Sequence, residues 1–377
     1  MSSPARSFSV TTDFPGGNAH VVRIENDEVW FKPDLRDTEG QWFYWCFRID
    51  GAAGRTLRFH TAEPNRISDR GPAVSLDDGN TWRWLGSGSQ DEFSYSFPSH
   101  AESVFFSVGM PYLERHLATF LGKYRMDSRL RIEALCLSRK GREVEKLVLS
   151  EPAGAEKPLV LLTARHHACE MMANYAIEGI VEAILSTGTA NLILKDFQIV
   201  IVPFVDKDGV EDGDQGKNRR PWDHNRDYVE GSIHPEIKAV KELGRNPRLP
   251  VRFFLDLHCP GLKGQLHTVI HLVGSSRESV WREQMIFAGL LESANRGSLP
   301  YKASDNLPFG TAWNTRESGR HSTFWAERLD GIKLATSIEI PYAIANGVEV
   351  NQKSVRTFGH SLAEAMALYL SINRGRD

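Results

Sequence analysis

The sequence predicts an α/β domain with a mixed, mostly parallel sheet between layers of helices, preceded by an all-β sandwich. In the first third of the chain, short segments rich in aromatic and β-branched residues alternate with turn signals. From about residue 120, apolar runs alternate with amphipathic stretches, the pattern of a sheet covered on both faces. The 377 residues are enough for two domains. We expect them to span residues 1–118 and 119–377.

The N-terminal domain is expected to form its strands from six segments. These are residues 20–31, 42–50, 55–61, 81–86, 92–99 and 102–110. The cluster Asp77-Asp78-Gly79-Asn80 marks a hairpin turn, because Gly and Asn tolerate positive φ. Five of the nine tryptophans fall here, namely Trp30, Trp42, Trp45, Trp82 and Trp84. We expect them to fill the core between two sheets, and the alternative is an aromatic platform that binds carbohydrate.

The second domain shows apolar strand segments followed by amphipathic helices. The strands are predicted at residues 158–164, 197–205, 251–258, 268–274 and 333–343, and the helices at about 169–185, 234–244, 277–295 and 354–372. Two long polar loops, residues 206–231 and 296–322, lie between them. Loops of that length inside a compact domain usually carry function.

Composition excludes several classes of protein. A net charge of −3 gives no electrostatic reason to expect nucleic acid or an anionic membrane as partner. No apolar run is long enough to span a bilayer, and the N-terminus lacks the apolar stretch of a signal peptide. The four cysteines are too few for a disulfide scaffold. We therefore expect a soluble, cytoplasmic enzyme whose oligomeric state the sequence does not reveal.

A possible metal site lies where two predicted strands end. His167 and Glu170 follow the strand 158–164, three positions apart, and His258 ends the strand 251–258. Catalytic zinc sites are built from three such ligands, two close in sequence and one distant, with a fourth position open to water. Taken alone, His167 and Glu170 could equally be a capping histidine and a first-turn glutamate of a helix.

Other polar residues also follow predicted strands, at the sheet edge where open α/β folds place their sites. Asp223, Asn225 and Arg226 lie in the loop after the strand 197–205. Glu339 stands between Ile338 and Ile340 in an otherwise apolar strand, where a carboxylate is costly to bury without a partner or a task. It is either paired with an arginine or serves as a general base beside a metal.

Five motifs in order make the sequence resemble the zinc metallocarboxypeptidase family, the carboxypeptidase A-like enzymes. The motifs are HHACE (166–170), DHNR (223–226), DLH (256–258), ESGR with FWAE (317–327) and SIEI (337–340). The layout is closest to the cytosolic carboxypeptidase branch and its bacterial relatives, which also place a β domain first. The resemblance that these motifs carry covers residues 158–343, and a looser likeness covers the β domain.

The resemblance implies one zinc ion held by His167, Glu170 and His258. It implies that Asp223 fixes the ring of His167, and that Glu339 takes a proton from the attacking water and passes it to the leaving amine.

Substrate recognition is implied in the same way. Asn225 and Arg226 would hold the terminal carboxylate of the substrate. An upstream arginine would polarise the scissile carbonyl, Arg219 or Arg220, with Arg219 preferred. Arg320, in the stretch aligned with the specificity pocket, hints at an acidic side chain in the substrate.

The sequence also departs from the family pattern. Ala168 and Cys169 stand between the first two ligands, where relatives carry Pro-Gly or Ser-Arg. The tyrosine that caps the substrate carboxylate is not identifiable, with Tyr301 and Tyr342 as candidates. Cys169 and Cys259 flank ligands and are expected to be small buried thiols rather than a fourth metal ligand.

These features predict a zinc carboxypeptidase that removes C-terminal residues from peptides or proteins. One alternative is a deacylase of the same fold that cleaves N-acyl amino acids. The other is a non-catalytic module whose tryptophan-rich β domain, residues 1–118, binds a glycan or a protein.

Overall fold

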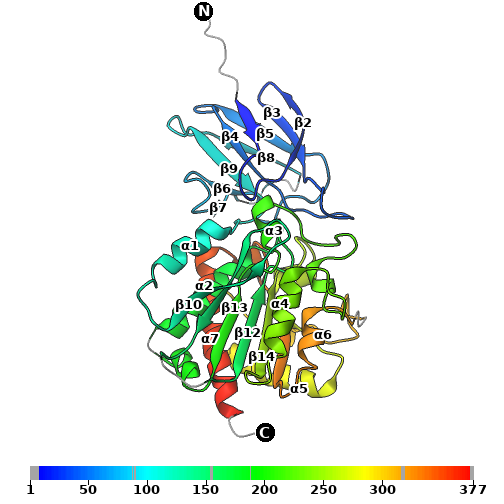
Figure 1. The fold of residues 1–377 in the computed structure, drawn as a ribbon. Coiled ribbons are helices and arrows are strands. Elements are labelled where there is room, and N and C mark those ends of the chain that lie inside the picture. The colour runs from blue at the N-terminus through cyan, green and yellow to red at the C-terminus, as the bar shows by residue number, and fades with distance from the viewer. Residues whose placement is uncertain are drawn as a thin grey trace, which may run out of the picture.

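The computed structural model describes residues 8–86, 88, 91–152, 156–186, 188–315 and 319–373. A β domain sits at one end of a larger α/β domain, with the short helix α3 (Lys207–Asp212) close to the boundary (Figure 1). The strands of the β domain are β1 (Ser9–Thr11), β2 (His20–Glu25), β3 (Glu28–Lys32), β4 (Cys46–Asp50), β5 (Thr56–Thr61), β6 (Ala73–Ser75), β7 (Arg83–Trp84), β8 (Glu92–Ser96) and β9 (Ser103–Ser107).

The β domain is the expected sandwich of two sheets. One sheet has the order β1-β4-β9-β6-β7 and the other β2-β3-β5-β8. Buried and more exposed residues alternate in β3, β5 and β8, and Phe31, Phe47, Phe59 and Phe106 meet in an aromatic core between the sheets. Ring packing of this kind adds specific geometry to the burial of a large apolar area.

The tryptophans do not share one role, so the expectation that all five fill this core is wrong. Trp45 is fully buried among the core phenylalanines. Trp84 instead packs against the α/β domain, where its Nε1 donates to the carbonyl of Val350 at 2.7 Å. Trp30 lies outside the core, with the guanidinium of Arg23 over its ring. These indoles therefore serve packing, domain contact and surface stacking respectively.

The α/β domain contains a seven-stranded sheet of order β10-β11-β13-β12-β14-β16-β15 within the described residues. Its elements are α1 (Glu114–Gly122), β10 (Leu130–Leu137), β11 (Glu143–Leu149), β12 (Leu159–Ala164), α2 (Met172–Leu185), β13 (Gln198–Val202), α3, α4 (Pro235–Gly244), β14 (Val251–His258), β15 (His271–Val273), α5 (Glu278–Ala294), α6 (Ser322–Ala326), β16 (Leu334–Glu339), the hairpin β17 (Ile344–Ala345) and β18 (Val348–Glu349), and α7 (Gln352–Ile372). The four strands β13, β12, β14 and β16 are parallel. The sequence prediction of a mixed, mostly parallel sheet is confirmed.

Helices cover both faces of this sheet. In the central strand β12, Val160 and Leu162 join the core under α2 and α7, whereas Leu159 and Leu161 join a second core under α4 and α6. A strand that is buried on both faces needs apolar residues at successive positions, which explains the continuous apolar sequence of β12.

Glycines allow α2 and α7 to approach closely behind the sheet. A Cβ at Gly179 would lie 1.9 Å from the carbonyl oxygen of Arg356, and one at Gly359 would lie 2.2 Å from that of Ala176. Any side chain at either position would force the helices apart. Because α2 begins just after Glu170, this contact also fixes the segment that carries a candidate ligand.

Three features differ from the sequence expectations or fall outside them. Strands β10 and β11 form an antiparallel edge of the sheet that the apolar pattern did not reveal, because their outer residues are largely exposed. The loop 206–231 contains α3, which is too short to show a helical period. The expected domain boundary at residue 118 lies inside α1.

Glu317 and Ser318 of the ESGR motif lie outside the described residues. In the described part of the chain, no helix combines the length and the apolar composition that a bilayer crossing requires.

His116 of α1 should make stability depend on pH. Its Nδ1 accepts from the backbone N–H of Leu113 at 2.8 Å, and its Nε2 lies 2.9 Å from the carbonyl oxygen of Gly79. Burial, followed by the nearby Arg115, lowers the pKa of His116 from 6.5 to about 4. Between these values the unfolded chain binds more protons than the folded one, so stability falls as the pH drops through this window.

We expect the unfolding free energy to decrease from pH 6.5 to 4, with His116 contributing a slope of up to about 1.4 kcal/mol per pH unit. Denaturant unfolding of wild type and His116→Asn across this range measures the effect. The variant should show a shallower slope, and equal slopes would contradict the assignment.

Candidate active site

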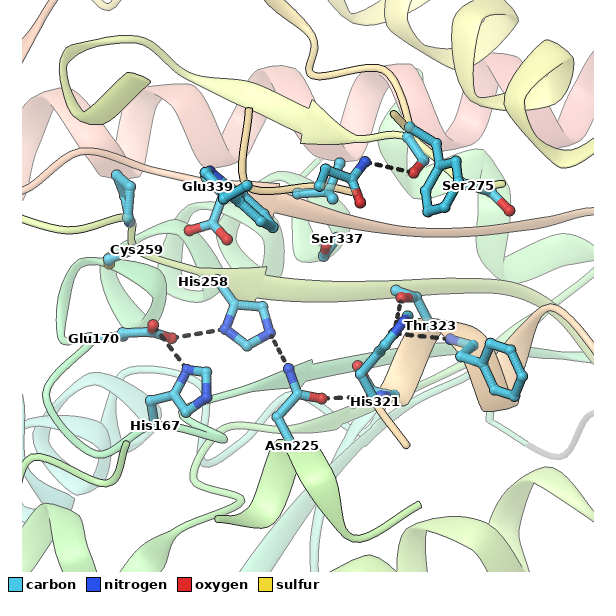
Figure 2. Close-up of a pocket in the computed structure, with 18 of the residues that line it drawn as sticks. His167, Glu170, Asn225, His258, Cys259, Ser275, His321, Thr323, Ser337 and Glu339 are labelled. Atoms are coloured by element: carbon cyan, nitrogen blue, oxygen red, sulfur yellow. Dashed lines mark hydrogen bonds and ion pairs between the residues drawn. The ribbon is translucent and has the colours of Figure 1, made fainter. Parts of the chain in front are cut away.

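The three predicted metal ligands and Glu339 converge at the carboxyl ends of parallel strands. His167 and Glu170 follow β12, His258 ends β14, and Glu339 ends β16. His258 and Glu339 are direct neighbours in the parallel β14–β16 ladder. Figure 2 shows Glu339 on the strand beside His258, with its carboxylate on the side of Glu170.

Glu170 lies between two imidazoles. One carboxylate oxygen is 2.9 Å from Nδ1 of His167, and the other is 2.7 Å from Nδ1 of His258 (Figure 2). The potential ligand atoms of the three residues all lie within 4.8 Å of one another, and Glu170 is only 1% exposed. Two imidazole nitrogens and a carboxylate oxygen are a donor set typical of catalytic zinc.

A carboxylate lies behind each imidazole, within hydrogen-bond distance of His258 and farther from His167. Asp256 Oδ2 lies 2.7 Å from Nε2 of His258, and Asp223 Oδ1 lies 3.7 Å from Nε2 of His167. Burial opposes ionisation of Asp256, but His166 and His258 hold its pKa well below its usual range. A carboxylate at Nε2 leaves Nδ1 free to bind a metal, so these residues fit a zinc ion.

His166 is excluded from this ligand set although it adjoins His167. Its Nδ1 lies 2.9 Å from Asp256 Oδ1, and its Nε2 lies 2.7 Å from the hydroxyl of Tyr228. Both ring nitrogens are therefore engaged inside the protein. Asp256 was not among the expected site residues, although it stands two positions before His258, on the same side of the strand.

Glu339 presents a buried carboxylate oxygen to the cavity. Its Oε2 is buried and has no hydrogen-bond partner among the described residues. A paired structural glutamate would instead lie against an arginine. The arrangement leaves Glu339 free to exchange a proton with a group in the cavity.

Asn225 and Arg226 both line the cavity that contains the ligand set. The side-chain nitrogen of Asn225 is 3.4 Å from His258 Nε2, and its oxygen accepts from the N–H of Ser322 at 2.9 Å. Arg226 is exposed, lines the same cavity, and donates to the carbonyl of Asn225 at 2.9 Å. The guanidinium is placed to meet an anionic group that enters from solvent.

The two arginines predicted to polarise the carbonyl do not line the cavity. Arg219 is engaged by three carboxylates, with Asp37 at 3.0 Å, Asp206 at 2.7 Å and Asp214 at 2.8 Å. Arg220 is exposed and pairs with a surface glutamate. Neither side chain is brought to the ligand set.

Lys217, rather than either of these arginines, is the cation that lies against the ligand set. Its ammonium lies 2.6 Å from a carboxylate oxygen of Glu170 and 5.1 Å from the ring centre of Trp42, and its side chain is 12% exposed. Burial opposes the charge, but Glu170 raises the pKa of this lysine above its usual range. In the sequence, only the position of Lys217 shortly before Asn225 indicates this cation.

Arg320 and the two candidate tyrosines also lie away from the cavity. The guanidinium of Arg320 stacks on Trp222, 4.2 Å from the ring centre. Tyr301 and Tyr342 are buried, and their hydroxyls are bonded to Asn306 and to the carbonyl of Cys169. Among the described lining residues of the cavity there is no tyrosine.

The two cysteines beside the ligands are buried, as expected. Burial raises the pKa of Cys169 to about 12, and that of Cys259 well above its usual value, so both thiols stay protonated near neutral pH. Neither belongs to a described group of potential metal ligands.

A cavity of about 380 Å³ opens in front of the ligand set. Besides the site residues, polar side chains line it on one side, including Ser275, Gln284, Glu327 and Ser337. Aromatic rings line it elsewhere, namely Trp42, Phe309, Trp313 and Phe324. Trp42 belongs to the β domain, so both domains contribute to the cavity wall.

Two family models match the chain and together cover more than half of it. Residues 120–246 match the model described as zinc carboxypeptidase, and residues 10–108 match the cytosolic carboxypeptidase N-terminal domain. Human cytosolic carboxypeptidase 6 is 27% identical over 180 residues, 44% of this chain and 36% of that protein. The chain thus spans about a third of the length of this relative.

Solved structures share the fold over almost the whole chain. A metallo-carboxypeptidase from Burkholderia cenocepacia aligns with a TM-score of 0.79 and 20% identity, covering 97% of this chain and 99% of that one. One from Pseudomonas aeruginosa, in complex with (2-guanidinoethylmercapto)succinic acid, aligns with a TM-score of 0.78 and 19% identity, covering 96% and 99%. The two family matches, joined in one chain with this fold, show that the protein belongs to the zinc carboxypeptidase family, with the N-terminal domain of the cytosolic carboxypeptidases.

Proposed function

We propose that the protein is a zinc-dependent carboxypeptidase that releases the C-terminal residue of peptides or proteins. The observation that carries this proposal is the ligand set of His167, Glu170 and His258 beside Glu339, whose buried Oε2 has no hydrogen-bond partner among the described residues. A single zinc ion would fit the set and, when bound, would activate water and polarise the scissile carbonyl. The names of the cytosolic relatives support a cytoplasmic location.

The protein residues would divide the remaining work. Arg226 and Asn225 would bind the terminal carboxylate of the substrate and so set its register in the cavity. Glu339 would accept a proton from the attacking water at Oε2 and deliver it to the departing amine. The Lys217 ammonium, which lines the cavity beside Glu170, would favour negative charge that develops on the carbonyl oxygen.

Release of C-terminal amino acids from a panel of peptides tests the activity. The panel should include peptides ending in Glu, Leu and Lys, with N-acylglutamate as a separate substrate. We expect residues to be released singly from the C-terminus. Turnover of N-acylglutamate without peptide cleavage would instead identify a deacylase.

The same panel tests the acidic preference suggested by Arg320. Because Arg320 stacks on Trp222 outside the cavity, a preference for Glu would have to arise indirectly. Equal cleavage of Glu-ending and Leu-ending peptides would remove that role. Absence of turnover with any substrate, together with glycan or protein binding by the intact chain, would favour a binding module.

A further inference from the structure

A loop of the β domain reaches the segment that carries Lys217. We call residues 34–44 the β-domain loop and residues 213–218 the lysine loop. The carboxylate of Asp37 accepts from the backbone N–H groups of Gln215 at 3.1 Å and Gly216 at 2.9 Å. The side chain of Gln215 makes two hydrogen bonds of 2.8 Å with the backbone of Tyr44. Its oxygen accepts from the N–H of Tyr44, and its nitrogen donates to the carbonyl. Thr38 donates to the carbonyl of Lys217 itself.

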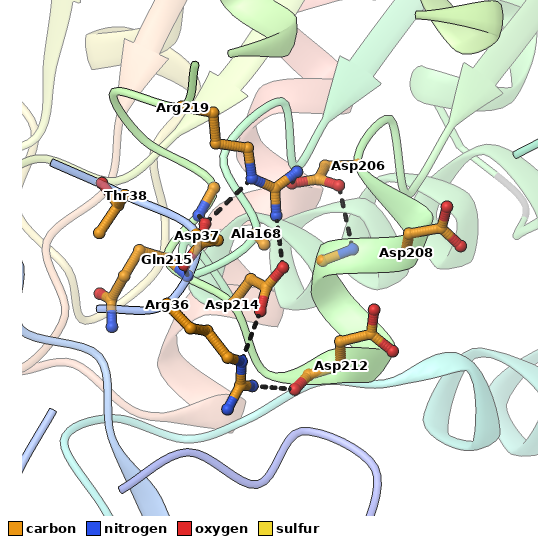
Figure 3. Close-up of polar contacts among 12 residues, drawn as sticks. Arg36, Asp37, Thr38, Ala168, Asp206, Asp208, Asp212, Asp214, Gln215 and Arg219 are labelled. Atoms are coloured by element: carbon orange, nitrogen blue, oxygen red, sulfur yellow. Dashed lines mark hydrogen bonds and ion pairs between the residues drawn. The ribbon is translucent and has the colours of Figure 1, made fainter. Parts of the chain in front are cut away.

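The same aspartate also fixes the residue just after the lysine loop. Asp37 accepts from Nε of Arg219 at 3.0 Å and Asp214 from a second guanidinium nitrogen at 2.8 Å, while the third nitrogen forms an ion pair with Asp206 at 2.7 Å (Figure 3). Asp206 is 1% exposed and Arg219 15% exposed, so this ion cluster is largely shielded from solvent. Removing one member of such a cluster leaves buried groups without partners.

The other side of the lysine loop rests on the segment that leads to the ligand Glu170. A Cβ at Gly216 would lie 2.1 Å from the backbone nitrogen of Ala168, so only glycine fits there, and its φ of +75° favours glycine too. The N–H of Cys169 donates to the carbonyl of Gln215 at 3.1 Å. The lysine loop is therefore held between the β domain and the zinc ligands.

We propose that the β domain is a functional part of the active site, with Asp37 as the positioning residue that holds the Lys217 ammonium against Glu170. The contribution of that ammonium to catalysis rests on the proposed carboxypeptidase activity, whereas its placement by Asp37 does not. Trp42 of the same β-domain loop covers the lysine side chain. The β domain thus fixes the position of the Lys217 ammonium, which influences both metal binding and transition-state stabilisation.

A double-mutant cycle between Asp37 and Lys217 tests the proposal in the full-length protein. Lys217→Met should lower kcat by about 10²-fold, as loss of a charge-stabilising donor does, with a smaller change in KM. It should also tighten zinc binding by about tenfold, because the cation no longer pairs with Glu170. Asp37→Asn should change both quantities in the same directions, and in the Lys217→Met background it should add nothing.

The matched control is Glu39→Gln. Glu39 lies in the same β-domain loop and pairs with the exposed Arg220, so kcat and zinc affinity should stay at wild-type values. Asp37→Glu, which retains the charge on a longer side chain, should fall between wild type and Asp37→Asn, and replaces Asp37→Asn in the cycle if that variant does not fold.

Zinc affinity, measured by competition with a chromogenic chelator, tests the positioning role of Asp37 even if the protein shows no turnover. If the wild type cleaves no peptide, the proposed function fails, while a non-additive effect on zinc affinity still supports the positioning role. Independent, additive effects of Asp37 and Lys217 would overturn it. A lowered Tm in Asp37→Asn with unchanged zinc affinity and kcat would also overturn it, because Asp37 would then be structural only.

Discussion

Glu339→Gln is expected to lower kcat for peptide hydrolysis by about 10²–10⁴-fold, the usual contribution of a general base. The amide keeps the size of the side chain but cannot take a proton from water. Because Glu339 makes no hydrogen bond through its buried Oε2, the substitution should leave the fold unchanged. Steady-state kinetics with the best peptide of the panel, alongside the zinc content per chain, measures the effect.

Glu278→Gln provides the control, since this glutamate is exposed at the start of α5 and does not line the cavity. It should retain wild-type kcat. A Glu339→Gln enzyme with wild-type kcat and bound zinc would exclude Glu339 as the base. Loss of zinc together with activity would instead make Glu339 part of the metal site.

Removal of zinc should abolish peptide release and also weaken the fold. Without the metal, the buried carboxylate of Glu170 has only protein cations and imidazoles around it. Zinc at about 1,000 times its Kd would stabilise the folded chain by about 4 kcal/mol, because the unfolded chain has no preformed site. Denaturant unfolding with chelator and with zinc added back measures this difference, and activity should return on add-back.

His258→Asn is the informative variant for that experiment. It removes one ligand, so added zinc should no longer raise the unfolding free energy or restore activity. If zinc stabilised the variant as strongly as the wild type, the ion would bind elsewhere. The groups formed by His224, His234 and Glu236, or by His166 and Asp256, would then need testing.

The parts of the fold that were predictable are those where local pattern and burial agree. Strand β12 is apolar along its whole length because both of its faces are covered, and helices α5 and α7 bury residues at helical spacing. The strand-end rule then placed His167, Glu170 and His258 together, since parallel strands bring their carboxyl ends to one edge.

The features that the sequence did not predict depend on contacts between segments far apart in the chain. Arg219 follows Asn218 in a polar loop, and nothing local reveals that three aspartates, one of them Asp37 in the other domain, neutralise it. Lys217 is directed to Glu170 by the same long-range contacts. Local sequence gives residue types, whereas the direction of a loop side chain is set by what packs on both sides of it.

His258 and Glu339 are paired on adjacent strands, so the spacing of the reacting groups and the composition of the cavity wall can be engineered separately. Backbone hydrogen bonding between β14 and β16 sets the spacing of ligand and base, at the ~4.8 Å interval of adjacent strands. The polar and aromatic cavity wall comes largely from other segments, such as those carrying Ser275, Phe309 and Phe324. Substrate choice can therefore be redesigned in those segments while the reacting groups keep their separation.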